Sequence, residues 1–361
     1  MTHDRLRWGI VGTGKIARVL AGVLAASETG DLVAVGSRTP ERAEAFADEF
    51  GLGGSRGGYE RVIADPDVDV VYVATDHPTH REWATAAADA GKHLLCEKPL
   101  AVHRTDAEAI AEAARRNDVF LLEAFAYRCH PQSERLVDLL GSGAIGEIRM
   151  LEAAFGYDAG PSPGNYLLVH ERGGGSILDV GCYPTSMAHL IARVASGAVA
   201  EPADVGGVAE IGPTGVDHYA SAVLRFEGGP IARLACSIQV DIESSLVVYG
   251  SEGRIAVPSP WLPARIGGRA EIVLQRSGAE PEVQRIDPGD EYVIEVDAVG
   301  AMIRDGVRSP SVLPWEEMLA NMGTLDRWRA AVGLRYEQDE VVAAGAGRAG
   351  LGAEEGGPWR P

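Results

Sequence analysis

The sequence predicts an α/β protein of two domains, a doubly wound parallel sheet followed by an α+β domain with a large, mostly antiparallel open sheet. Three observations support this prediction. The chain has 361 residues, a length that suits two domains. Strand-like and helix-like segments alternate through about the first 125 residues, which is typical of a parallel sheet. After Pro131, strand-like segments follow one another across short turns, which indicates antiparallel pairing.

The N-terminal domain is expected to comprise residues 1–125, with five strands and four helices between them. Each strand is a short run rich in β-branched residues, and each helix has the apolar periodicity of a half-buried helix. The right-handed crossover of such units leaves few topologies. The expected strands are Leu6 to Val11, Leu32 to Ser37, Val68 to Ala74, His93 to Cys96 and Val119 to Leu122, and the expected helices are 15–26, 40–50, 80–90 and 105–116.

The second domain is expected to comprise residues 126–336, followed by a tail at 337–361. Gly-Gly at 228–229 and Gly-Ser-Glu-Gly at 250–253 are predicted turns between successive strands. The tail is rich in Gly, Ala and Glu without apolar periodicity, so it is expected to be poorly ordered. The expected helices are 132–140, 176–195, 290–305 and 315–332, the last two packing back on the first domain, and the expected strands are 147–157, 216–226, 230–240, 244–250, 253–257, 270–275 and 282–286.

Composition and charge favour a protein that acts on small molecules. The chain is 46% hydrophobic and 24% charged, as in ordinary soluble proteins, and its formal net charge of −19 disfavours nucleic acid and anionic membrane as partners. No apolar run is long enough to span a bilayer and no signal-peptide pattern opens the chain, so a cytoplasmic location is expected. The four cysteines (96, 129, 182 and 236) lie far apart, so neither a disulfide framework nor a metal site is expected.

A glycine-rich segment, Gly12-Thr13-Gly14-Lys15-Ile16-Ala17, follows the first predicted strand and opens the first helix. In a dinucleotide site the first glycine permits the tight turn, the second lets the pyrophosphate approach the helix N-terminus, and the alanine permits close helix packing. An ordinary glycine turn is the alternative. The position directly after an N-terminal strand favours a Rossmann domain whose cofactor contacts residues 12–16.

Ser37 and Arg38 follow the second predicted strand, where an NAD site usually carries an acidic residue that binds the ribose. A small hydroxyl residue followed by arginine suits a 2′-phosphate instead. Arg38 as a solvated charge at a helix start is the alternative. We therefore expect NADP(H) as the preferred cofactor, with NAD(H) as the second choice.

Glu97-Lys98-Pro99 closes the fourth predicted strand, at the carboxyl edge where ligands of such folds bind. Because proline restricts the residue before it to an extended backbone, the Lys98 side chain is expected to have a fixed direction. A surface-loop lysine is the alternative. We expect Glu97 and Lys98 to lie beside the cofactor.

Thr75, His77 and His80 follow the third predicted strand and face the same sheet edge. Two histidines three residues apart permit a metal site, but no further Cys or His lies nearby in the sequence. We therefore expect no bound metal. His80 is interpreted as a helix-start residue near the cofactor, and Thr75 and His77 as further cofactor contacts.

A glycine-rich loop at residues 173–175 runs into a predicted helix that carries Asp179 and Tyr183. The i, i+4 spacing places the carboxylate and the phenol on one helical face, so both side chains can point into one cleft. The alternative is an acidic residue near a helix N-terminus together with a core tyrosine.

Taken in order, these motifs resemble the glucose-fructose oxidoreductase and inositol dehydrogenase (Gfo/Idh/MocA) family over nearly the whole chain. Three features make the sequence most similar to the branch of dimeric dihydrodiol dehydrogenases and NADP-dependent D-xylose dehydrogenases: Tyr183, where inositol dehydrogenases carry His, the motif Thr75-Asp-His77-Pro-x-His80, and Ser37-Arg38. Ala126, where relatives usually carry Met or Trp, is a departure that predicts a wider substrate pocket. The motifs are Gly12-x-Gly14-x-x-Ala17, Glu97-Lys98-Pro99, Glu123-Ala-Phe-Ala-Tyr127-Arg128-x-His130-Pro131 and Gly174-Gly175-x-x-x-Asp179-x-Gly181-x-Tyr183.

The resemblance implies a catalytic Lys98, a Tyr183 that gives or takes the proton, an Asp179 that binds and orients substrate, and a substrate contact by Arg128. It also implies a cis peptide bond before Pro99. A phenol is a poor base at neutral pH, and we expect the Lys98 ammonium to favour its ionised form.

The implied activity is hydride transfer between NADP(H) and a CH–OH or C=O group of a sugar, a cyclic polyol or a trans-diol. Two alternatives remain, an NAD-linked inositol-type dehydrogenase and a non-catalytic dinucleotide-binding regulatory protein. Retention of the lysine, aspartate and tyrosine favours an enzyme. Apolar residues also alternate along Ile231 to Val240 and Leu246 to Tyr249, which predicts a sheet face that is covered in a homodimer, as the resemblance implies as well.

Overall fold

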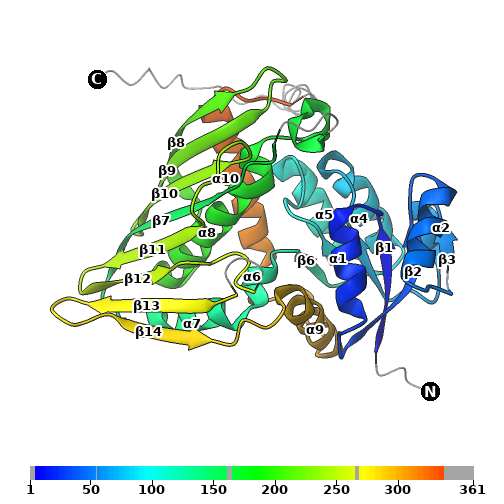
Figure 1. The fold of residues 1–361 in the computed structure, drawn as a ribbon, viewed down its shortest axis with the longest axis horizontal. Coiled ribbons are helices and arrows are strands. Elements are labelled where there is room, and N and C mark those ends of the chain that lie inside the picture. Colours follow the sequence, from blue (N-terminus) through cyan, green and yellow to red (C-terminus); the bar gives the residue numbers. More distant parts are fainter. Residues whose placement is uncertain (1–4, 54, 161–164, 265–267, 337–361) are drawn as a thin grey trace.

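The N-terminal domain is built on a parallel sheet of six strands in the order β3-β2-β1-β4-β5-β6. The computed structural model describes residues 5–53, 55–160, 165–264 and 268–336 (Figure 1). The predicted α/β class and doubly wound sheet are confirmed. The strands are β1 Leu6–Val11, β2 Gly30–Gly36, β3 Ser55–Gly57, β4 Val70–Val73, β5 His93–Cys96 and β6 Leu121–Glu123, and the helices are α1 Lys15–Leu24, α2 Pro40–Glu49, α3 Tyr59–Ala64, α4 His80–Asp89 and α5 Arg104–Arg116.

The parallel strands are apolar because helices cover both faces of the sheet. All four residues of β4 are buried, and α1 turns a stripe of alanine, valine and leucine towards the sheet. Strand β3 and helix α3 were not predicted. Each is short, and β3 lies at the sheet edge within a glycine-rich stretch at 51–58, so it carries no apolar run that distinguishes it from a loop.

The second sheet has eight strands in the order β14-β13-β12-β11-β7-β10-β9-β8. Its neighbouring strands are antiparallel except β7 and β10, so the prediction of a mostly antiparallel sheet is confirmed. The strands are β7 Ile148–Gly156, β8 Pro202–Ile211, β9 Asp217–Phe226, β10 Ile231–Ser237, β11 Ser245–Gly250, β12 Gly253–Val257, β13 Ala270–Arg276 and β14 Glu282–Ile286.

Edge strand β8 was also missed. It pairs with β9, but every residue after Pro202 is at least partly exposed, and its glycines and acidic residues give no clear apolar alternation. The predicted strand 230–240 is too long, since β10 ends at Ser237. Edge strands with one pairing partner need little burial, so hydrophobic patterning does not detect them.

Helices cover one face of the second sheet and connect the two domains (Figure 1). Helix α10 contacts α8 and β8 on one side and α5 and β6 on the other, while α9 contacts α1, β2 and α6. The Asp297 carboxylate on α9 accepts hydrogen bonds from Ser27 Oγ and Thr29 Oγ1, at 2.6 and 2.9 Å. The helices are α6 Ala126–Cys129, α7 Pro131–Gly141, α8 Cys182–Ser196, α9 Glu291–Arg304 and α10 Trp315–Ala331.

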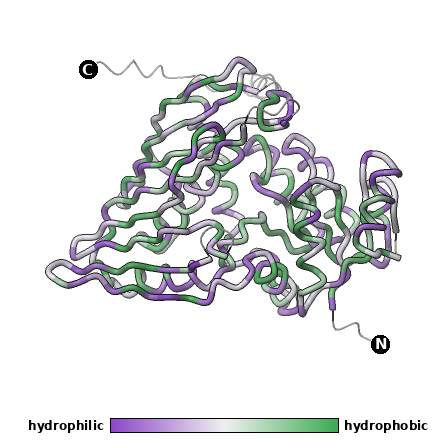
Figure 2. The backbone as a smooth tube through the Cα atoms, in the orientation of Figure 1, coloured by the Kyte–Doolittle hydropathy of each residue, from purple (hydrophilic) through white to green (hydrophobic). Residues whose placement is uncertain are grey.

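The other face of the second sheet carries exposed apolar side chains. Val208, Tyr219, Val223 and Ile231 alternate with residues that point into the core, and the strand register places all four on the same face. Figure 2 shows hydrophobic and hydrophilic residues intermixed along the strands of this sheet. No helix in the described part of the chain covers this face in Figure 1.

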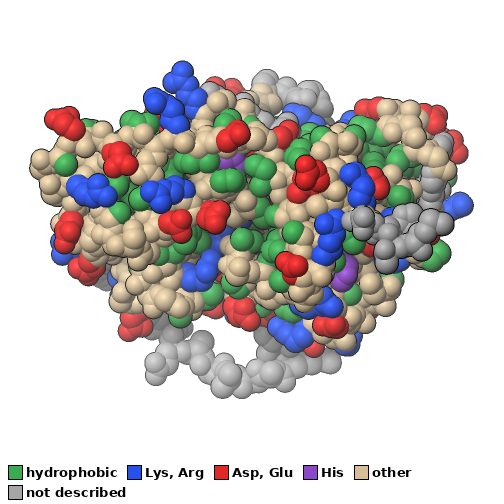
Figure 3. All heavy atoms as spheres, turned by 90° about the horizontal axis from the view of Figure 1, so that it is seen from below, with side chains coloured by type: hydrophobic (Ala, Val, Ile, Leu, Met, Phe, Trp, Pro, Cys, Tyr) green, Lys and Arg blue, Asp and Glu red, His purple; other side chains and the backbone are tan. Residues whose placement is uncertain are grey.

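The surface charge is mixed. In the view from below, acidic and basic side chains are interspersed over both domains without a continuous basic stripe (Figure 3). A search of the described residues finds no helix with the length and apolar character needed to cross a membrane.

Candidate active site

Four loops meet at the carboxyl edge of the parallel sheet, because parallel strands end on the same side. They follow β1, β2, β4 and β5, and they carry the predicted cofactor residues together with Lys98. The second domain adds the segment from Gly173 to Tyr183. Apart from Arg128, the residues predicted from the sequence therefore lie in these five segments of the chain.

The loop after β1 has the geometry that the glycine fingerprint predicts. Gly12 has a φ of +122°, and a Cβ there would lie 2.3 Å from the carbonyl oxygen of Ala74, so only glycine fits. Gly14 precedes α1, which has no side-chain N-cap, and a Cβ on Gly14 would meet no heavy atom within 4 Å. The first amides of α1 are thus open to an anionic ligand.

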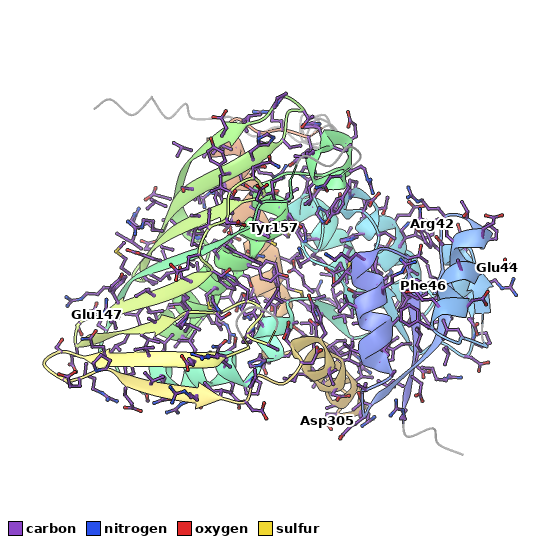
Figure 4. The ribbon with its side chains drawn as sticks, viewed as in Figure 1. Arg42, Glu44, Phe46, Glu147, Tyr157 and Asp305 are labelled. Carbon is purple, nitrogen blue, oxygen red and sulfur yellow. The ribbon has the colours of Figure 1, made fainter. Side chains whose placement is uncertain are left out.

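The loop after β2 brings hydroxyl and guanidinium groups together. Ser37 is buried and its Oγ lies 3.0 Å from Oγ1 of Thr13. The guanidinium groups of Arg38 and Arg42 lie near Tyr59, the first residue of α3. Burial raises the pKa of the Tyr59 phenol, and the positive charges of Arg38 and Arg42 oppose this rise. Arg38 is exposed, as is Arg42 on α2 (Figure 4). Arg42 was not predicted; it lies four residues after Arg38, in the first turn of α2, and adds a second cation at this strand end.

Lys98 and Asp179 form an ion pair between the two domains. Lys98 Nζ donates to the Asp179 carbonyl oxygen at 2.8 Å and lies 3.3 Å from Oδ1, with side-chain exposures of 15% and 6%. Burial lowers the pKa of Lys98, but Asp179 and Tyr183 outweigh it and hold the pKa well above its ordinary value. Burial raises the pKa of Asp179, but Lys98 and Tyr157 bring it below its ordinary value. Both groups are therefore charged.

Buried carboxyl groups hold the backbone on either side of Pro99, and the Lys98–Pro99 bond is cis, as the resemblance implied. The Lys98 amide donates to Glu97 Oε2 at 3.2 Å, and the Leu100 amide donates to Glu123 Oε1 at 2.8 Å. Tyr72 donates its hydroxyl proton to Glu97 Oε1. This network fixes the direction in which Lys98 leaves the sheet.

Two buried histidines support the same loop. His80 lies between two carbonyl oxygens, with Nδ1 3.1 Å from Pro99 O and Nε2 3.1 Å from Thr75 O. His77 Nδ1 lies 3.2 Å from the carbonyl oxygen of Gly173, in the loop that leads to Asp179. Burial, with His80 and Lys98 nearby, lowers the pKa of His77 to about 3, so its ring is neutral.

Tyr183 lies beside the ammonium, but its ionisation differs from the prediction. Lys98 Nζ is 5.2 Å from the centroid of the Tyr183 ring. Burial raises the pKa of Tyr183 well above its ordinary value, and Lys98 only partly opposes it. The expectation that Lys98 favours the phenolate is right in direction and wrong in outcome, because desolvation of the buried phenol is the larger effect.

The segment that carries Asp179 begins with a π-helix at Ile177–Gly181, so the predicted regular helix 176–195 is wrong in its first turn. Asp217, buried at the start of β9, holds this turn: its Oδ2 accepts from Ser176 Oγ at 2.6 Å and from the Ile177 amide at 2.7 Å. A Cβ on Gly175, where φ is +109°, would lie 2.2 Å from Asp217 Oδ1. Asp217 therefore anchors the segment that carries Asp179 to the sheet.

Arg128 lies elsewhere than its predicted substrate contact requires. Its guanidinium is buried, donates to Glu317 Oε1 at 2.6 Å and also bonds the carbonyl oxygens of Val312 and Ser186. Its guanidinium nitrogens thus bond α6 to α8 through Ser186 and to α10 through Glu317. This placement argues against a substrate contact, so Arg128 is not carried into the proposal below.

Aromatic residues that were not predicted from the sequence lie beside Asp179 and Tyr183. Tyr157, just beyond β7, donates to Asp179 Oδ2 at 2.6 Å. The Phe155, Tyr183 and Trp261 rings pack with centroids 5.1 to 6.1 Å apart. A cavity of about 550 Å³ adjoins this cluster and is lined by Phe155, Gly156, Tyr157, Asp241, Ile242, Glu243, Ser244, Pro258 and Leu262. These residues are scattered along the chain, so no local motif identifies them.

The described residues contain no group of three or more His, Cys, Asp or Glu side chains that could hold a metal ion. The site is built instead from a lysine, a carboxylate, tyrosines and an open helix N-terminus. Such groups suit recognition of hydroxyl-bearing compounds and of a nucleotide.

Comparison with family models gives two matches. Residues 6–125 match the model described as an oxidoreductase family with an NAD-binding Rossmann fold, and residues 134–256 match the GFO/IDH/MocA C-terminal domain. An uncharacterized oxidoreductase from Rhizobium meliloti is 34% identical over 86% of this chain and 93% of its own. The trans-1,2-dihydrobenzene-1,2-diol dehydrogenase of Mus musculus is 32% identical over 93% of this chain and 99% of its own.

Two solved oxidoreductase structures are similar to this chain over most of its length. A 3-ketoreductase from Actinomadura kijaniata, in complex with NADP and TDP-benzene, has a TM-score of 0.79 and 29% identity, covering 91% of this chain and 98% of its own. An aldose-aldose oxidoreductase from Caulobacter crescentus, complexed with glycerol, has a TM-score of 0.80 and 26% identity with the same coverage. Both similarities extend over the two domains.

The anchoring carboxyl of Asp217 generates a prediction about stability. Burial raises its pKa to about 7, against the hydrogen bonds from Ser176 and Ile177. Between the ordinary pKa of an aspartate and pH 7, Asp217 is ionised in the unfolded chain but still protonated in the folded protein. Rising pH therefore stabilises the unfolded chain and lowers the stability of the wild type, whereas asparagine does not titrate, so the stability of Asp217→Asn lacks this pH dependence. We expect the melting temperature of Asp217→Asn minus that of the wild type to increase from pH 5 to pH 8.

Asp69→Asn is the matched control. Burial raises the pKa of Asp69, but its bonds with Arg7 outweigh this and hold the pKa below its ordinary value. The stabilisation from the Asp69–Arg7 pair is complete above the ordinary pKa of an aspartate. The melting temperature of Asp69→Asn minus that of the wild type should therefore stay constant from pH 5 to pH 8. Parallel pH curves for Asp217→Asn and Asp69→Asn would contradict the assignment.

Proposed function

The chain belongs to the GFO/IDH/MocA oxidoreductase family, and on that premise we propose that it transfers a hydride between NADP(H) and a CH–OH or C=O carbon of a sugar, a cyclic polyol or a trans-diol. One observation carries the proposal. The buried ion pair of Lys98 and Asp179, with Tyr183 beside it, lies at the carboxyl edge of the parallel sheet, at the end of the strand two places from the fingerprint loop. This arrangement offers a hydroxyl-bearing carbon both binding groups and a proton.

The residues at the sheet edge fit a dinucleotide. The open start of α1 and the space around Gly14 suit a pyrophosphate, and Ser37, Arg38 and Arg42 suit a 2′-phosphate. When bound, the cofactor supplies the nicotinamide carbon that gives or takes the hydride. The residues assigned to it are Gly12, Thr13, Gly14, Lys15, Ile16, Ser37, Arg38, Thr75, His77, His80, Glu97 and Lys98.

Tyr183 is assigned to proton transfer. Since its pKa lies above the ordinary value, the phenol is protonated in the ligand-free protein and is ready to donate. In reduction, hydride forms a bond with the carbonyl carbon, the C=O π-electron pair moves to oxygen, and that oxygen takes the phenolic proton. In oxidation the phenolate accepts the hydroxyl proton, and the Lys98 ammonium stabilises that phenolate. Oxidation is therefore favoured by high pH.

Asp179 is assigned to substrate binding. Its carboxylate is charged, and each of its oxygens retains acceptor capacity beyond the bonds to Lys98 and Tyr157. A substrate hydroxyl that donates to Asp179 is held next to Tyr183. Phe155 lines the cavity and offers an apolar surface to the carbon skeleton of a ring substrate, while the fully buried Trp261 packs against Phe155.

We also propose a cytoplasmic homodimer. The cysteines are free thiols, three of them buried, which suits a reducing compartment. The exposed apolar face that carries Val208, Tyr219, Val223 and Ile231 suits face-to-face packing with a second copy. Such faces are rarely left open to water.

The first prediction from this proposal concerns chemistry. Lys98→Met and Tyr183→Phe should each lower kcat with the best sugar or diol by about 10²-fold or more. Tyr183→Phe should leave NADP(H) affinity and melting temperature little changed, whereas Lys98→Met should also lower the melting temperature, because it leaves the buried Asp179 carboxylate without its ion-pair partner. Asp179→Asn should act partly through KM. Because Lys98 acts through the phenol, the double variant should be scarcely worse than either single one. Steady-state assays of cofactor reduction from pH 6 to pH 10 measure this, and full turnover by Tyr183→Phe would rule out its role.

The second concerns the cofactor. NADP(H) should bind more tightly than NAD(H), and Arg38→Ala should narrow the gap by about tenfold or more, because charged contacts with a phosphate contribute about 1.5–3 kcal/mol. Fluorescence titration gives both dissociation constants. Arg116→Ala is the control, because it removes an exposed arginine at the end of α5 that pairs with Asp89 at the end of α4. It should leave the ratio of the two dissociation constants unchanged. Equal wild-type affinities for the two cofactors would contradict the assignment.

The third concerns assembly. Light scattering at micromolar concentration should give the mass of a dimer, and Val223→Lys should give that of a monomer, because it places a charge in the exposed apolar face. Ala301→Lys puts the same charge on an exposed position of α9 and should leave the dimer intact. A monomeric wild type would exclude the proposed packing.

A further inference from the structure

Tyr157 lies where the cavity meets the catalytic carboxylate. It follows β7, between the second sheet and the first domain (Figure 4). Its amide donates to the carbonyl oxygen of Ser237 at 3.0 Å, which fixes the backbone, and its hydroxyl donates to Asp179 Oδ2. Tyr157 both lines the cavity of about 550 Å³ and donates a hydrogen bond to Asp179.

The direction of this hydrogen bond is fixed. Burial raises the pKa of the Tyr157 phenol, and the Asp179 carboxylate raises it further, so Tyr157 keeps its proton and points it at Asp179. A phenolic oxygen that donates its one proton can still accept. A second group that bonds Tyr157 must therefore be a donor, as a substrate hydroxyl is.

The two carboxylate oxygens of Asp179 have different neighbours. Oδ1 lies 3.3 Å from Lys98 Nζ, on the side of the first domain and of Tyr183, whereas Oδ2 bonds Tyr157 on the side of the cavity. The groups thus run in the order Lys98, Asp179, Tyr157. A substrate whose reacting oxygen is near Lys98 and Tyr183 extends its neighbouring carbon past Asp179 towards Tyr157.

We propose that Tyr157 binds the hydroxyl next to the one that is oxidised, and thereby makes this site select a 1,2-diol unit over an isolated alcohol. The inference rests on the proposed function and adds a substrate-contacting residue to it. Its physical basis is the cost of covering polar groups without replacing their bonds to water. An alcohol that fills the cavity without the second hydroxyl leaves the acceptor side of the phenol unsatisfied, whereas a diol satisfies it.

The test compares Tyr157→Phe with the wild type on pairs of substrates that differ in the neighbouring hydroxyl. The pairs are trans-1,2-cyclohexanediol with cyclohexanol, and D-glucose with 2-deoxy-D-glucose. The wild type should prefer the first member of each pair, and Tyr157→Phe should lower that preference in kcat/KM by about tenfold, mainly through KM, as expected for one hydrogen bond. NADP(H) affinity, measured by fluorescence titration, should stay the same and shows that the variant is folded.

Tyr249→Phe is the matched control, because it removes a hydroxyl from a half-buried tyrosine on β11 that does not line the cavity. It should keep the wild-type preference. An equal loss of kcat/KM on both members of a pair would show that Tyr157 only holds Asp179 in place, and would overturn the inference while leaving the proposed function intact. A wild type that oxidises neither member of either pair nor any other sugar or diol would overturn the proposed function and this inference with it.

Discussion

The ammonium of Lys98 is buried, and a buried charge must be paired. Its partner, Asp179, comes from the other domain and meets it with both a carbonyl oxygen and a carboxylate oxygen. The remaining features of the site follow from this requirement. Carboxyl groups and His80 fix the loop that carries the lysine, while Asp217 and Tyr157 fix the segment that carries the aspartate. The proposed active site is therefore also the joint between the domains.

The first domain offers strand ends that converge by topology, and it carries buried carboxyl groups of its own at that edge. Glu97 is bonded to Tyr72 and to the Lys98 amide, and Glu123 accepts from the Leu100 amide. The second domain brings Asp179 and Tyr183 from a helix packed on its sheet. The strong net negative charge of the chain has little influence here, because the site balances its own charges locally.

Local patterns in the sequence were enough to predict the two sheets, the fingerprint loop and the lysine motif, because each depends on residues close together in the chain. The patterns failed where structure depends on distant partners. Strand β8 pairs with β9 without a buried face, and the π-helix before α8 is set by Asp217 on another strand. The bonds of Arg128 to α8 and α10 and the bond of Tyr157 to Asp179 are tertiary contacts that leave no local signature.

The central claim is that substrate lies between Tyr183 and the Lys98–Asp179 pair, with the cofactor along the sheet edge. A crystal structure of the protein with NADP⁺ and a slowly reacting diol tests it most directly. We expect one substrate hydroxyl within hydrogen-bond distance of Tyr183, another beside Asp179, and the carbon that bears the first hydroxyl facing the nicotinamide. A diol bound elsewhere, or a nicotinamide turned away from Lys98, would contradict it.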